Sequence, residues 1–344
     1  MTHCHFEGSF ETRIEKSEQG KGLSSFKLAY FYNMFSQVFK ECIPDFKSTG
    51  LQAIQKLWKG YGTIYRYRTG GNAFVVKHYN WKSLAQAQSL EEEFALERKI
   101  NSFKNELSWY TLSPLESLAS HFPVYYNSWE GEKEIILILS DLQEKGFKCG
   151  GNLFVELGIK STLSFLAKFH ARSLNPSQSI IPGGYWHLSL RSYEHQQMIL
   201  GQLKQAAGHI QETIDNAAYQ CLIHGDAKPA NYAYRKTDGE IMAYDFQYWG
   251  KGIGVQDLAC YLFGVVSNEQ EWELFSEYYF QALQNSLAGH ENAGDIIRLW
   301  RDLYPLCRLD YYRFLLGWNP QHGKLANYNP IPDLALLSSQ LRHS

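Results

Sequence analysis

Three oxygen-bearing side chains in the C-terminal half of the chain have the chemistry that phosphoryl transfer requires. Asp226 follows a short apolar stretch, Asn231 comes five residues later, and Asp245 ends a further apolar stretch. A phosphoryl transfer needs a carboxylate that orients the attacking hydroxyl and accepts its proton. It also uses Mg²⁺, which prefers hard oxygen ligands and usually takes one or two carboxylates together with substrate phosphates. We therefore predict Asp226 as the catalytic base and Asn231 and Asp245 as the metal ligands.

A β-hairpin between Asn231 and Asp245 would bring these three residues together. Residues 232–235 and 240–244 have strand character and surround the sequence Lys-Thr-Asp-Gly at residues 236–239. An Asp-Gly pair between two such segments is typical of a tight hairpin turn. Asn231 stands at the start of the first strand and Asp245 at the end of the second, so the hairpin returns Asp245 close to Asn231.

These motifs resemble a known superfamily. The His-Gly-Asp sequence at residues 224–226, with Asn231, resembles the catalytic loop of aminoglycoside phosphotransferases and choline kinases, which are protein-kinase-like. The Asp-Phe-Gln sequence at residues 245–247 resembles the Asp-Phe-Gly of protein kinases. With Asp-Leu-Ala at residues 257–259 and Leu-Ala-Lys-Phe-His-Ala at residues 166–171, the chain is most similar to the ecdysteroid-kinase-like branch. The resemblance implies ATP as phosphoryl donor and Mg²⁺ as metal cofactor.

The same resemblance implies a nucleotide-binding region in the N-terminal half. Lys77 ends a Val-Val-Lys sequence and matches the lysine that binds the α- and β-phosphates, while Glu106 matches the helix glutamate that pairs with it. Gly60 and Gly62 match the glycine-rich loop, where missing side chains let backbone N–H groups approach the phosphates. The residues expected at the hinge, where adenine would meet backbone groups, are Ser140, Asp141 and Leu142.

Two of these assignments have alternatives in the sequence. Lys228 matches the protein-kinase lysine that neutralises the transferred phosphate, so we predict it as a second catalytic residue, but a solvated loop lysine fits the sequence equally well. Glu97 and the glutamates at residues 91–93 compete with Glu106 as the partner of Lys77.

For three further polar residues near the motifs, we expect a structural role rather than a catalytic one. His224 could serve as a base, but the resemblance implies that it shapes the catalytic loop. His170 is expected to pack inside a helical core. Asp257 is expected to brace a loop or helix start rather than bind the metal.

The elements that must position these residues follow a simple order. Strands are predicted at residues 54–58, 63–67, 73–79, 122–129 and 134–139. Helices are predicted at residues 26–46 and within 83–110, and after a Gly-rich connector at 145–152 they continue at 153–173, 193–218, 255–266, 269–286 and 296–317.

The expected fold is therefore α+β and bilobal, as in protein kinases. It has an N-terminal lobe with an antiparallel sheet plus helices and a mainly helical C-terminal lobe that carries the catalytic hairpin. We expect a mobile N-terminal segment at 1–25, a nucleotide-binding lobe with the hinge at its end at 26–142, and a catalytic and substrate-binding lobe at 143–344.

The composition and charge of the chain limit the classes of partner that it is expected to bind. A net charge of −2 provides no global basic field for nucleic acid. No apolar run reaches the roughly 20 residues needed to span a bilayer, and the first residues lack the layout of a signal peptide. The six scattered cysteines form no Cys-x-x-Cys pair that would indicate a zinc site. We expect a cytoplasmic enzyme whose partner is a small molecule with a hydroxyl group.

The length of the segment after Asp245 favours a small acceptor over a protein. Only residues 246–256 separate Asp245 from Asp257, and no Ala-Pro-Glu motif follows, so a protein kinase is the weaker alternative. A catalytically inactive pseudokinase is disfavoured because the base, both metal ligands and the lysine are all present.

The C-terminal third suggests which small acceptor would bind. Its aromatic residues favour a neutral or weakly polar alcohol, bound over the segments that hold Trp272 and Tyr311-Tyr312. Trp186, Trp318 and Tyr328 are expected to add aromatic surface to this pocket. Choline-like amines rank second and aminoglycosides third, because the acids at residues 268–280 are better explained as the solvated face of an amphipathic helix.

Overall fold

The computed structural model describes residues 36–43, 45–57, 60–82, 90–149, 156–198 and 201–341. The segment predicted to be mobile at 1–25 lies outside the described residues. Of the helix predicted at 26–46, only the last part is described, and residues 36–40 are helical. No helix in these ranges is both long enough and apolar enough to cross a membrane.

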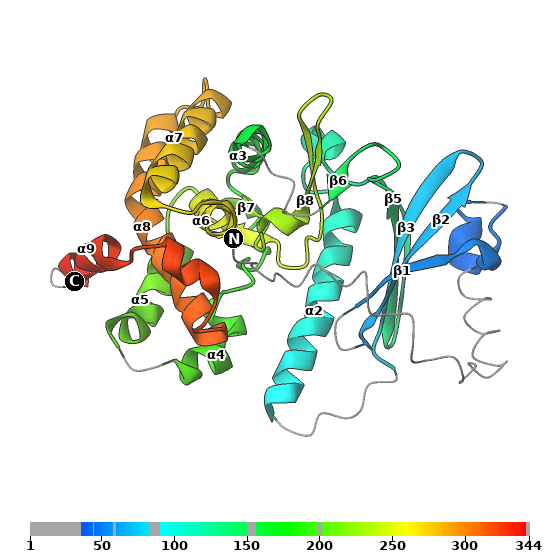
Figure 1. Ribbon diagram of the computed structural model, residues 1–344, viewed down its shortest axis with the longest axis horizontal. Coiled ribbons are helices and arrows are strands. Elements are labelled where there is room, and N and C mark those ends of the chain that lie inside the picture. Colours follow the sequence, from blue (N-terminus) through cyan, green and yellow to red (C-terminus); the bar gives the residue numbers. More distant parts are fainter. Residues whose placement is uncertain are drawn as a thin grey trace, which may run out of the picture.

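The N-terminal part is an antiparallel sheet of five strands with one long helix beside it (Figure 1). The order across the sheet is β1-β2-β3-β5-β4. The strands are β1 (Gln52–Lys56), β2 (Gly62–Thr69), β3 (Asn72–Asn80), β4 (Tyr125–Gly131) and β5 (Glu134–Ser140). Helix α2 (Leu90–Leu112) lies between the sheet and the helical part of the molecule (Figure 1). All five predicted strands are therefore confirmed, with boundaries shifted by a few residues.

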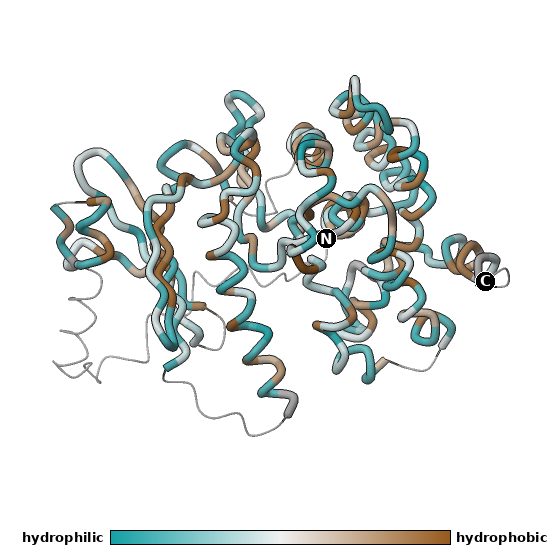
Figure 2. Tube along the Cα trace, turned by 180° about the vertical axis from the view of Figure 1, so that it is seen from behind, coloured by the Kyte–Doolittle hydropathy of each residue, from teal (hydrophilic) through white to brown (hydrophobic). Residues whose placement is uncertain are grey.

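The sequence of β5 explains why it is the central apolar strand. Ile135, Leu137 and Leu139 pack toward α2 and the helical part, in the main core of the protein. Ile136 and Ile138 point to the opposite face, where Phe39 and other residues of the first described helix cover the sheet. Because successive strand side chains alternate between faces, a strand buried on both faces has an unbroken apolar sequence. The brown stretch of the sheet in Figure 2 marks this strand.

The C-terminal part is mainly helical. Its helices are α3 (Glu156–Arg172), α4 (Ser192–Gln197), α5 (Gln202–Asp215), α6 (Gly254–Val265), α7 (Glu269–Ser286), α8 (Ala293–Trp318) and α9 (Ile331–Leu341). Helix α3 packs against α7, and α6 packs against α8. Short 3₁₀ turns are η1 (Ser48–Gly50), η3 (Glu116–His121), η5 (Leu188–Leu190), η6 (Pro229–Asn231) and η7 (Gly323–Asn327). The arrangement confirms the predicted bilobal α+β fold.

Two small sheets position the candidate site between these parts. Strands β8 (Tyr232–Arg235) and β9 (Glu240–Ala243) form the predicted hairpin, and β6 (Lys148–Cys149) adds a third strand. Strand β7 (Cys221–Ile223), which precedes the catalytic loop, pairs with β10 (Gly250–Gly252).

Three details differ from the sequence prediction. The helix predicted at 193–218 is two helices, α4 and α5, with Met198 in an extended conformation after α4. Strand β6 lies inside the Gly-rich connector, where no strand was predicted, because it adds to the edge of the hairpin. Helix α9 follows the last predicted helix and packs on α8.

Candidate active site

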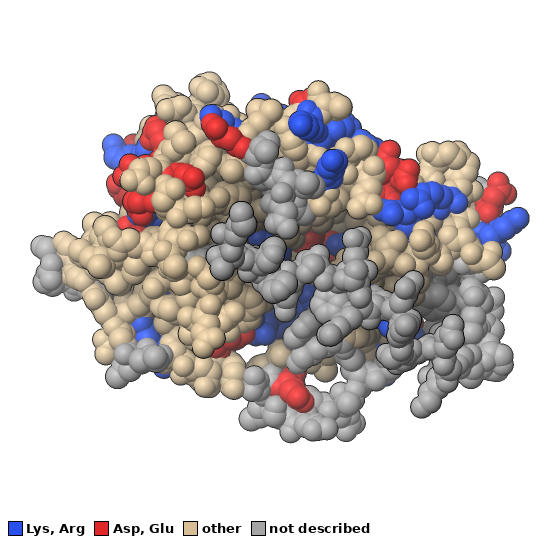
Figure 3. All heavy atoms as spheres, viewed as in Figure 1, with Lys and Arg blue, Asp and Glu red and all other residues tan. Residues whose placement is uncertain are grey.

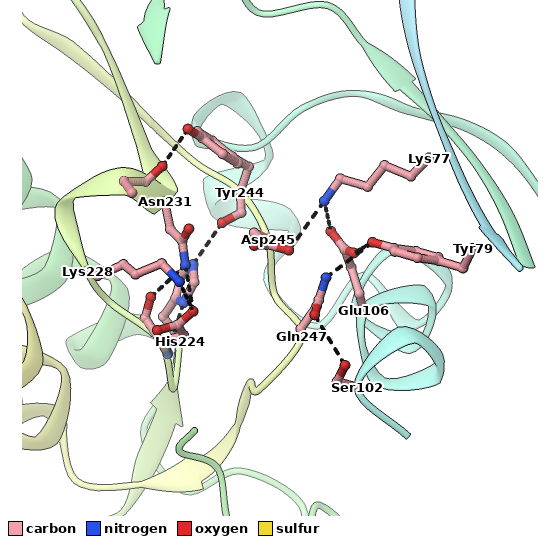
Figure 4. A network of polar contacts seen from close by, with 12 residues as sticks. Lys77, Tyr79, Ser102, Glu106, His224, Lys228, Asn231, Tyr244, Asp245 and Gln247 are labelled. Atoms are coloured by element: carbon pink, nitrogen blue, oxygen red, sulfur yellow. Dashed lines mark hydrogen bonds and ion pairs between the residues drawn. The ribbon is translucent and has the colours of Figure 1, made fainter. Parts of the chain in front are cut away.

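The loop between β7 and β8 brings Asp226 and Asn231 into direct contact, and Figure 4 shows Asn231 beside Lys228 of the same loop. The amide nitrogen of Asn231 donates to the backbone oxygen of Asp226 at 2.8 Å and to its carboxylate Oδ2 at 3.0 Å. The ammonium of Lys228 donates to the same Oδ2 at 2.8 Å. The backbone N–H of Tyr244 donates to the carbonyl of Asn231 at 3.0 Å, which closes the hairpin beside Asp245. Asp226, Lys228, Asn231 and Asp245 therefore lie in one region, as the local sequence predicted.

Asp257, at the start of α6, holds the catalytic loop in place. Its carboxylate accepts hydrogen bonds from the backbone N–H groups of His224 at 2.6 Å and Gly225 at 2.9 Å. The ring of His224 contacts the carbonyl of Tyr244 at 3.0 Å. His170 is fully buried against Asp257 at 3.2 Å. These contacts match the structural roles expected for the two histidines and for Asp257.

Gly225 is required by the close packing of this loop. Its φ is +75°, a conformation that residues with a side chain rarely adopt. A Cβ atom at Gly225 would lie 1.9 Å from the carbonyl oxygen of Tyr248. The glycine of the His-Gly-Asp motif thus allows the catalytic loop to run against the segment that follows Asp245.

Lys77 on β3 pairs with Glu106 on α2. Its Nζ lies 2.6 Å from Glu106 Oε1 and 3.4 Å from Asp245 Oδ1. Glu106 is fully buried and also accepts a hydrogen bond from the hydroxyl of Tyr79. Glu97, the competing partner considered from the sequence, is exposed. The structure therefore places Glu106 beside Lys77 and leaves Glu97 outside the site.

The electrostatics of the site favour the charged forms of Lys77 and Asp245. Burial alone would lower the pKa of Lys77, but Glu106 and Asp245 raise it above its ordinary value. Burial likewise opposes ionisation of Asp245, yet the ammonium groups of Lys77, Lys228 and Lys99 lower the pKa of Asp245 from 3.8 to about 2. Asp245 is thus an anion at neutral pH.

The backbone of Asp245 has a left-handed conformation, with φ of +69°. Such conformations are uncommon outside glycine, although aspartate tolerates them better than most residues, and they cluster at functional sites. This geometry follows directly after the second hairpin strand and turns the carboxylate toward Lys77.

A cavity of about 500 Å³ lies between the sheet and the hairpin. Lys77, Lys228, Asn231 and Asp245 line it from the catalytic side. The predicted hinge residues line it at the opposite end, and they are Ser140, Asp141 and Leu142. The cavity therefore joins the hinge to the candidate phosphate-binding and metal-binding groups, as a nucleotide site requires.

Two hinge N–H groups are already used inside the protein. The N–H of Ser140 donates to Val124 and that of Asp141 to Ala73, at 2.9 and 3.1 Å. The carboxylate of Asp141 pairs with Arg66, a residue of β2 that also lines the cavity. Arg66 was not singled out in the sequence, since a strand arginine carries no local signal of a partner 75 residues away.

Gly60 lies before β2 and Gly62 is the first residue of β2, and neither is among the residues that line this cavity. The φ of Gly62 is +141°, and a Cβ atom there would lie 2.0 Å from the carbonyl oxygen of His78. Gly62 is thus explained by the close approach of β2 to β3. Nothing comparable surrounds Gly60, where a Cβ would meet no atom within 4 Å.

The aromatic pocket predicted for the acceptor is corrected for three of its six residues. Trp318 is 46% exposed and Tyr311 and Tyr312 are partly buried, but the other three are buried. Trp186, Trp272 and Tyr328 are 1%, 1% and 4% exposed, so they cannot offer a binding surface. Trp272 packs against Phe263 instead, with ring centroids 5.0 Å apart. These rings form the core between the C-terminal helices, because large apolar side chains on amphipathic helices pack inward.

The aromatic side chains beside the catalytic loop are Tyr185 and Tyr248, which the sequence prediction missed. The N–H of Tyr185 donates to the carbonyl of Gly225 at 2.6 Å, and the rings of Tyr185 and Tyr248 have centroids 4.8 Å apart. The guanidinium of Arg191 lies 3.6 Å from the centre of the Tyr185 ring. The only signal in the sequence was the nearness of Tyr248 to Asp245, since Tyr185 reaches the loop through long-range packing.

We expect the Lys77–Glu106 pair to behave as one unit in mutagenesis. Breaking a buried ion pair by removing one partner typically costs about 3–5 kcal/mol, because the other charge stays buried and unpaired. Lys77→Met and Glu106→Gln should each lower stability and nucleotide affinity, and the double variant should lose less than the sum of the two. Denaturant unfolding and ATP titrations measure both effects. Glu97→Gln on the same helix is the matched control, and additive effects of Lys77→Met and Glu106→Gln would contradict the pairing.

A comparison with protein families finds a match over part of the chain. Residues 185–290, which hold the catalytic loop, the hairpin and Asp257, match the model of the ecdysteroid kinase-like family. No curated protein matches the chain significantly.

The solved structure of a choline kinase shares the architecture. Choline kinase LicA from Streptococcus pneumoniae aligns with a TM-score of 0.51 at 13% identity, over 92% of this chain and 100% of that one. A microcompartment-associated aminopropanol kinase aligns with a TM-score of 0.49 at 13% identity, over 82% and 89% of the two chains. The chain therefore has the protein-kinase-like fold, and its resemblance to the ecdysteroid kinase-like family is confirmed over residues 185–290.

Proposed function

We propose that this protein is an ATP- and Mg²⁺-dependent kinase that transfers the γ-phosphoryl group to a hydroxyl of a small molecule. The observation that carries the proposal is one cavity lined by Lys77, which Glu106 holds 3.4 Å from Asp245, and by Asn231, whose amide donates to the neighbouring Asp226. These groups come from β3, α2, the catalytic loop and the end of the hairpin, and their convergence suits a bound nucleotide triphosphate.

The residues at the end of the hairpin fit a magnesium ion. Asp245 offers an ionised carboxylate and Asn231 an amide oxygen, both hard ligands of the kind that Mg²⁺ prefers. Within the described residues, no group of three or more His, Cys, Asp or Glu side chains could hold a metal alone. A site with Asp245 and Asn231 as its protein ligands suits Mg²⁺, which is often bound by one or two protein ligands together with substrate phosphates. When bound, the metal would neutralise charge on the phosphate oxygens.

Asp226 has a geometry suited to a general base. Lys228 and Asn231 both donate to its Oδ2, whereas Oδ1 accepts no hydrogen bond from the described residues. In the proposed reaction the acceptor hydroxyl donates its proton to Oδ1 as its oxygen bonds to the γ-phosphorus. The bond from that phosphorus to the β–γ bridging oxygen breaks, and ADP leaves. Lys77 and Lys228 stabilise the phosphate charges, and Lys228 stays protonated because Asp226 and Asp245 raise its pKa despite partial desolvation.

The segment after Asp245 supports a small acceptor. Residues 250–252 form β10 and pair with β7, and α6 begins at Gly254. This connector is therefore built into the fold, and it offers no extended platform for a peptide chain.

The charges of α7 argue against a cationic acceptor. Glu277 pairs with Arg301 at 2.8 Å, and Glu269 lies 3.5 Å from Arg308 on α8. Figure 3 shows acidic and basic side chains interspersed over this region. These acids form a solvated helix face, as expected, and do not converge on Asp226. With Tyr185 and Tyr248 beside the loop, we rank a neutral or weakly polar alcohol first.

The test is acceptor-dependent ADP formation by the purified protein with ATP and Mg²⁺. The panel should hold neutral hydroxylated metabolites, choline and ethanolamine, aminoglycosides and casein, with mass spectrometry of the products. We expect a phosphorylated neutral alcohol. Turnover of aminoglycosides alone would reverse the ranking, casein phosphorylation would remove the small-molecule proposal, and Mg²⁺-dependent ATP binding without turnover of any acceptor would indicate a pseudokinase.

A further inference from the structure

One face of α2 contacts the segment that follows Asp245. Lys99, Ser102, Asn105, Glu106 and Trp109 are spaced three or four residues apart, with Asn105 and Glu106 adjacent in the middle. Residues at this spacing lie on the same side of a helix. Each of them contacts either residues 246–249 or the Lys77 pair, so this helix face serves the candidate active site as a whole.

Gln247 takes part in three of these contacts, and Figure 4 shows its amide between Ser102 and Tyr79. Its amide oxygen accepts hydrogen bonds from Lys99 at 2.7 Å and from Ser102 at 3.2 Å. Its amide nitrogen donates to the hydroxyl of Tyr79 at 3.3 Å. Because an ammonium can only donate, the amide oxygen must face Lys99, and this orientation directs the nitrogen toward Tyr79. The side chain is 9% exposed, so its hydrogen bonds are shielded from water.

These contacts close a ring of polar interactions. Tyr79 accepts from Gln247 and donates to Glu106, Glu106 pairs with Lys77, and Lys77 reaches Asp245. Asp245 lies two residues before Gln247 in the chain. A displacement of the Gln247 side chain would therefore disturb both partners of Lys77, which are Glu106 and Asp245.

The backbone on either side of Gln247 is fixed by the same helix. The side chain of Asn105 donates to the carbonyls of Gln247 at 3.2 Å and Trp249 at 2.9 Å, and the indole N–H of Trp249 donates to the carbonyl of Asn105 at 2.8 Å. Trp109 stacks on Phe246 with centroids 3.9 Å apart and an angle of 5° between the rings. Residues 246–249 are thus attached to α2 through both polar and aromatic contacts.

We infer that Gln247 is a positioning residue that joins α2 to the metal-binding loop and keeps Lys77, Glu106 and Asp245 assembled. This inference rests on the proposed function. Glycine, which stands at the corresponding place of Asp-Phe-Gly, has no side chain to make these contacts. Glutamine suits the position because one amide supplies both an acceptor for Lys99 and a donor for Tyr79.

The first test compares Gln247→Leu with wild type. We expect hydrogen exchange to become faster in α2 and in residues 246–249, and turnover at saturating ATP to fall by about 10- to 100-fold, as is typical when a group that orients a metal ligand is lost. Gln247→Glu keeps the acceptor for Lys99 but loses the donor to Tyr79, so its turnover should lie between those of the wild type and Gln247→Leu. Gln281→Leu, on the exposed face of α7, is the matched control and should behave as wild type.

The second test separates positioning from a merely structural role. In a Lys77→Met background, Gln247→Leu should have little further effect on turnover, since Gln247 acts through Glu106 and Lys77. If Gln247→Leu does not fold, Tyr79→Phe breaks the same link while keeping the ring stacked on Phe103. Unchanged hydrogen exchange in α2, or additive effects with Lys77→Met, would overturn the inference. A wild-type protein that binds no ATP with Mg²⁺ would instead overturn the proposed function, and the exchange comparison would still decide the role of Gln247.

Discussion

Replacing Asp226 by asparagine should abolish phosphoryl transfer while leaving the fold and ATP binding intact. Asparagine has the same shape and can keep a contact with Lys228, but it cannot accept the proton of the acceptor hydroxyl. Removal of a positioned general base typically costs about 10²- to 10⁴-fold in rate. The measurement is kcat with the acceptor that the wild type phosphorylates best, together with calorimetric titration of ATP in the presence of Mg²⁺.

A suitable control makes the same chemical change elsewhere in the hairpin. Asp238 is exposed at the turn between β8 and β9 and pairs with Arg235 at 2.8 Å. Asp238→Asn removes a carboxylate without reaching the cavity, so its kcat should equal that of the wild type. If Asp226→Asn turns over as fast as Asp238→Asn, Asp226 is not the base.

Replacing Asp245 by alanine should remove most of the Mg²⁺ dependence of ATP binding and lower turnover by about 10²- to 10³-fold, the usual effect of losing one preorganised electrostatic group. The variant loses the charged ligand proposed for the metal and also a contact of Lys77. Asn231→Ala should have a smaller effect, because it removes a neutral ligand. Calorimetric titrations of ATP with and without Mg²⁺ measure the difference directly.

Asp295→Ala, at the exposed start of α8, controls for the loss of one negative charge from the molecule. Its affinity for ATP should depend on Mg²⁺ as strongly as that of the wild type. Should Asp245→Ala show the same dependence, the metal is held elsewhere and Asp245 serves Lys77 alone.

Local sequence was sufficient to predict the hairpin and the residues at its open end. Asn231 and Asp245 were expected to meet because a short hairpin with an Asp-Gly turn fixes which residues face each other at its open end. Residues 232–235 and 240–244 were predicted to form the hairpin, and the structure pairs 232–235 with 240–243. The bilobal fold followed from the change of periodicity along the chain and from the resemblance that these motifs carry.

Contacts between residues far apart in the sequence could be identified only from the tertiary structure. Glu106 and Glu97 lie on the same helix, and only the rotation of α2 against the sheet buries Glu106 beside Lys77 while Glu97 faces solvent. The link from Lys99 to Gln247 spans 148 residues and has no local signal. Nothing in the residues around Gln247 indicates that α2 would supply its partners.

The surroundings of the aromatic residues in the C-terminal third could likewise not be predicted from the sequence. Their number in the sequence is consistent either with a ligand pocket or with a core, and the packing of α6, α7 and α8 places Trp272 and Tyr328 in the core. Sequence by itself thus determined the chemistry available and the local geometry of the hairpin, because both depend on residues a few positions apart. The tertiary structure decided which charges are buried together and which rings lie in the core, because burial depends on how separate elements pack against each other.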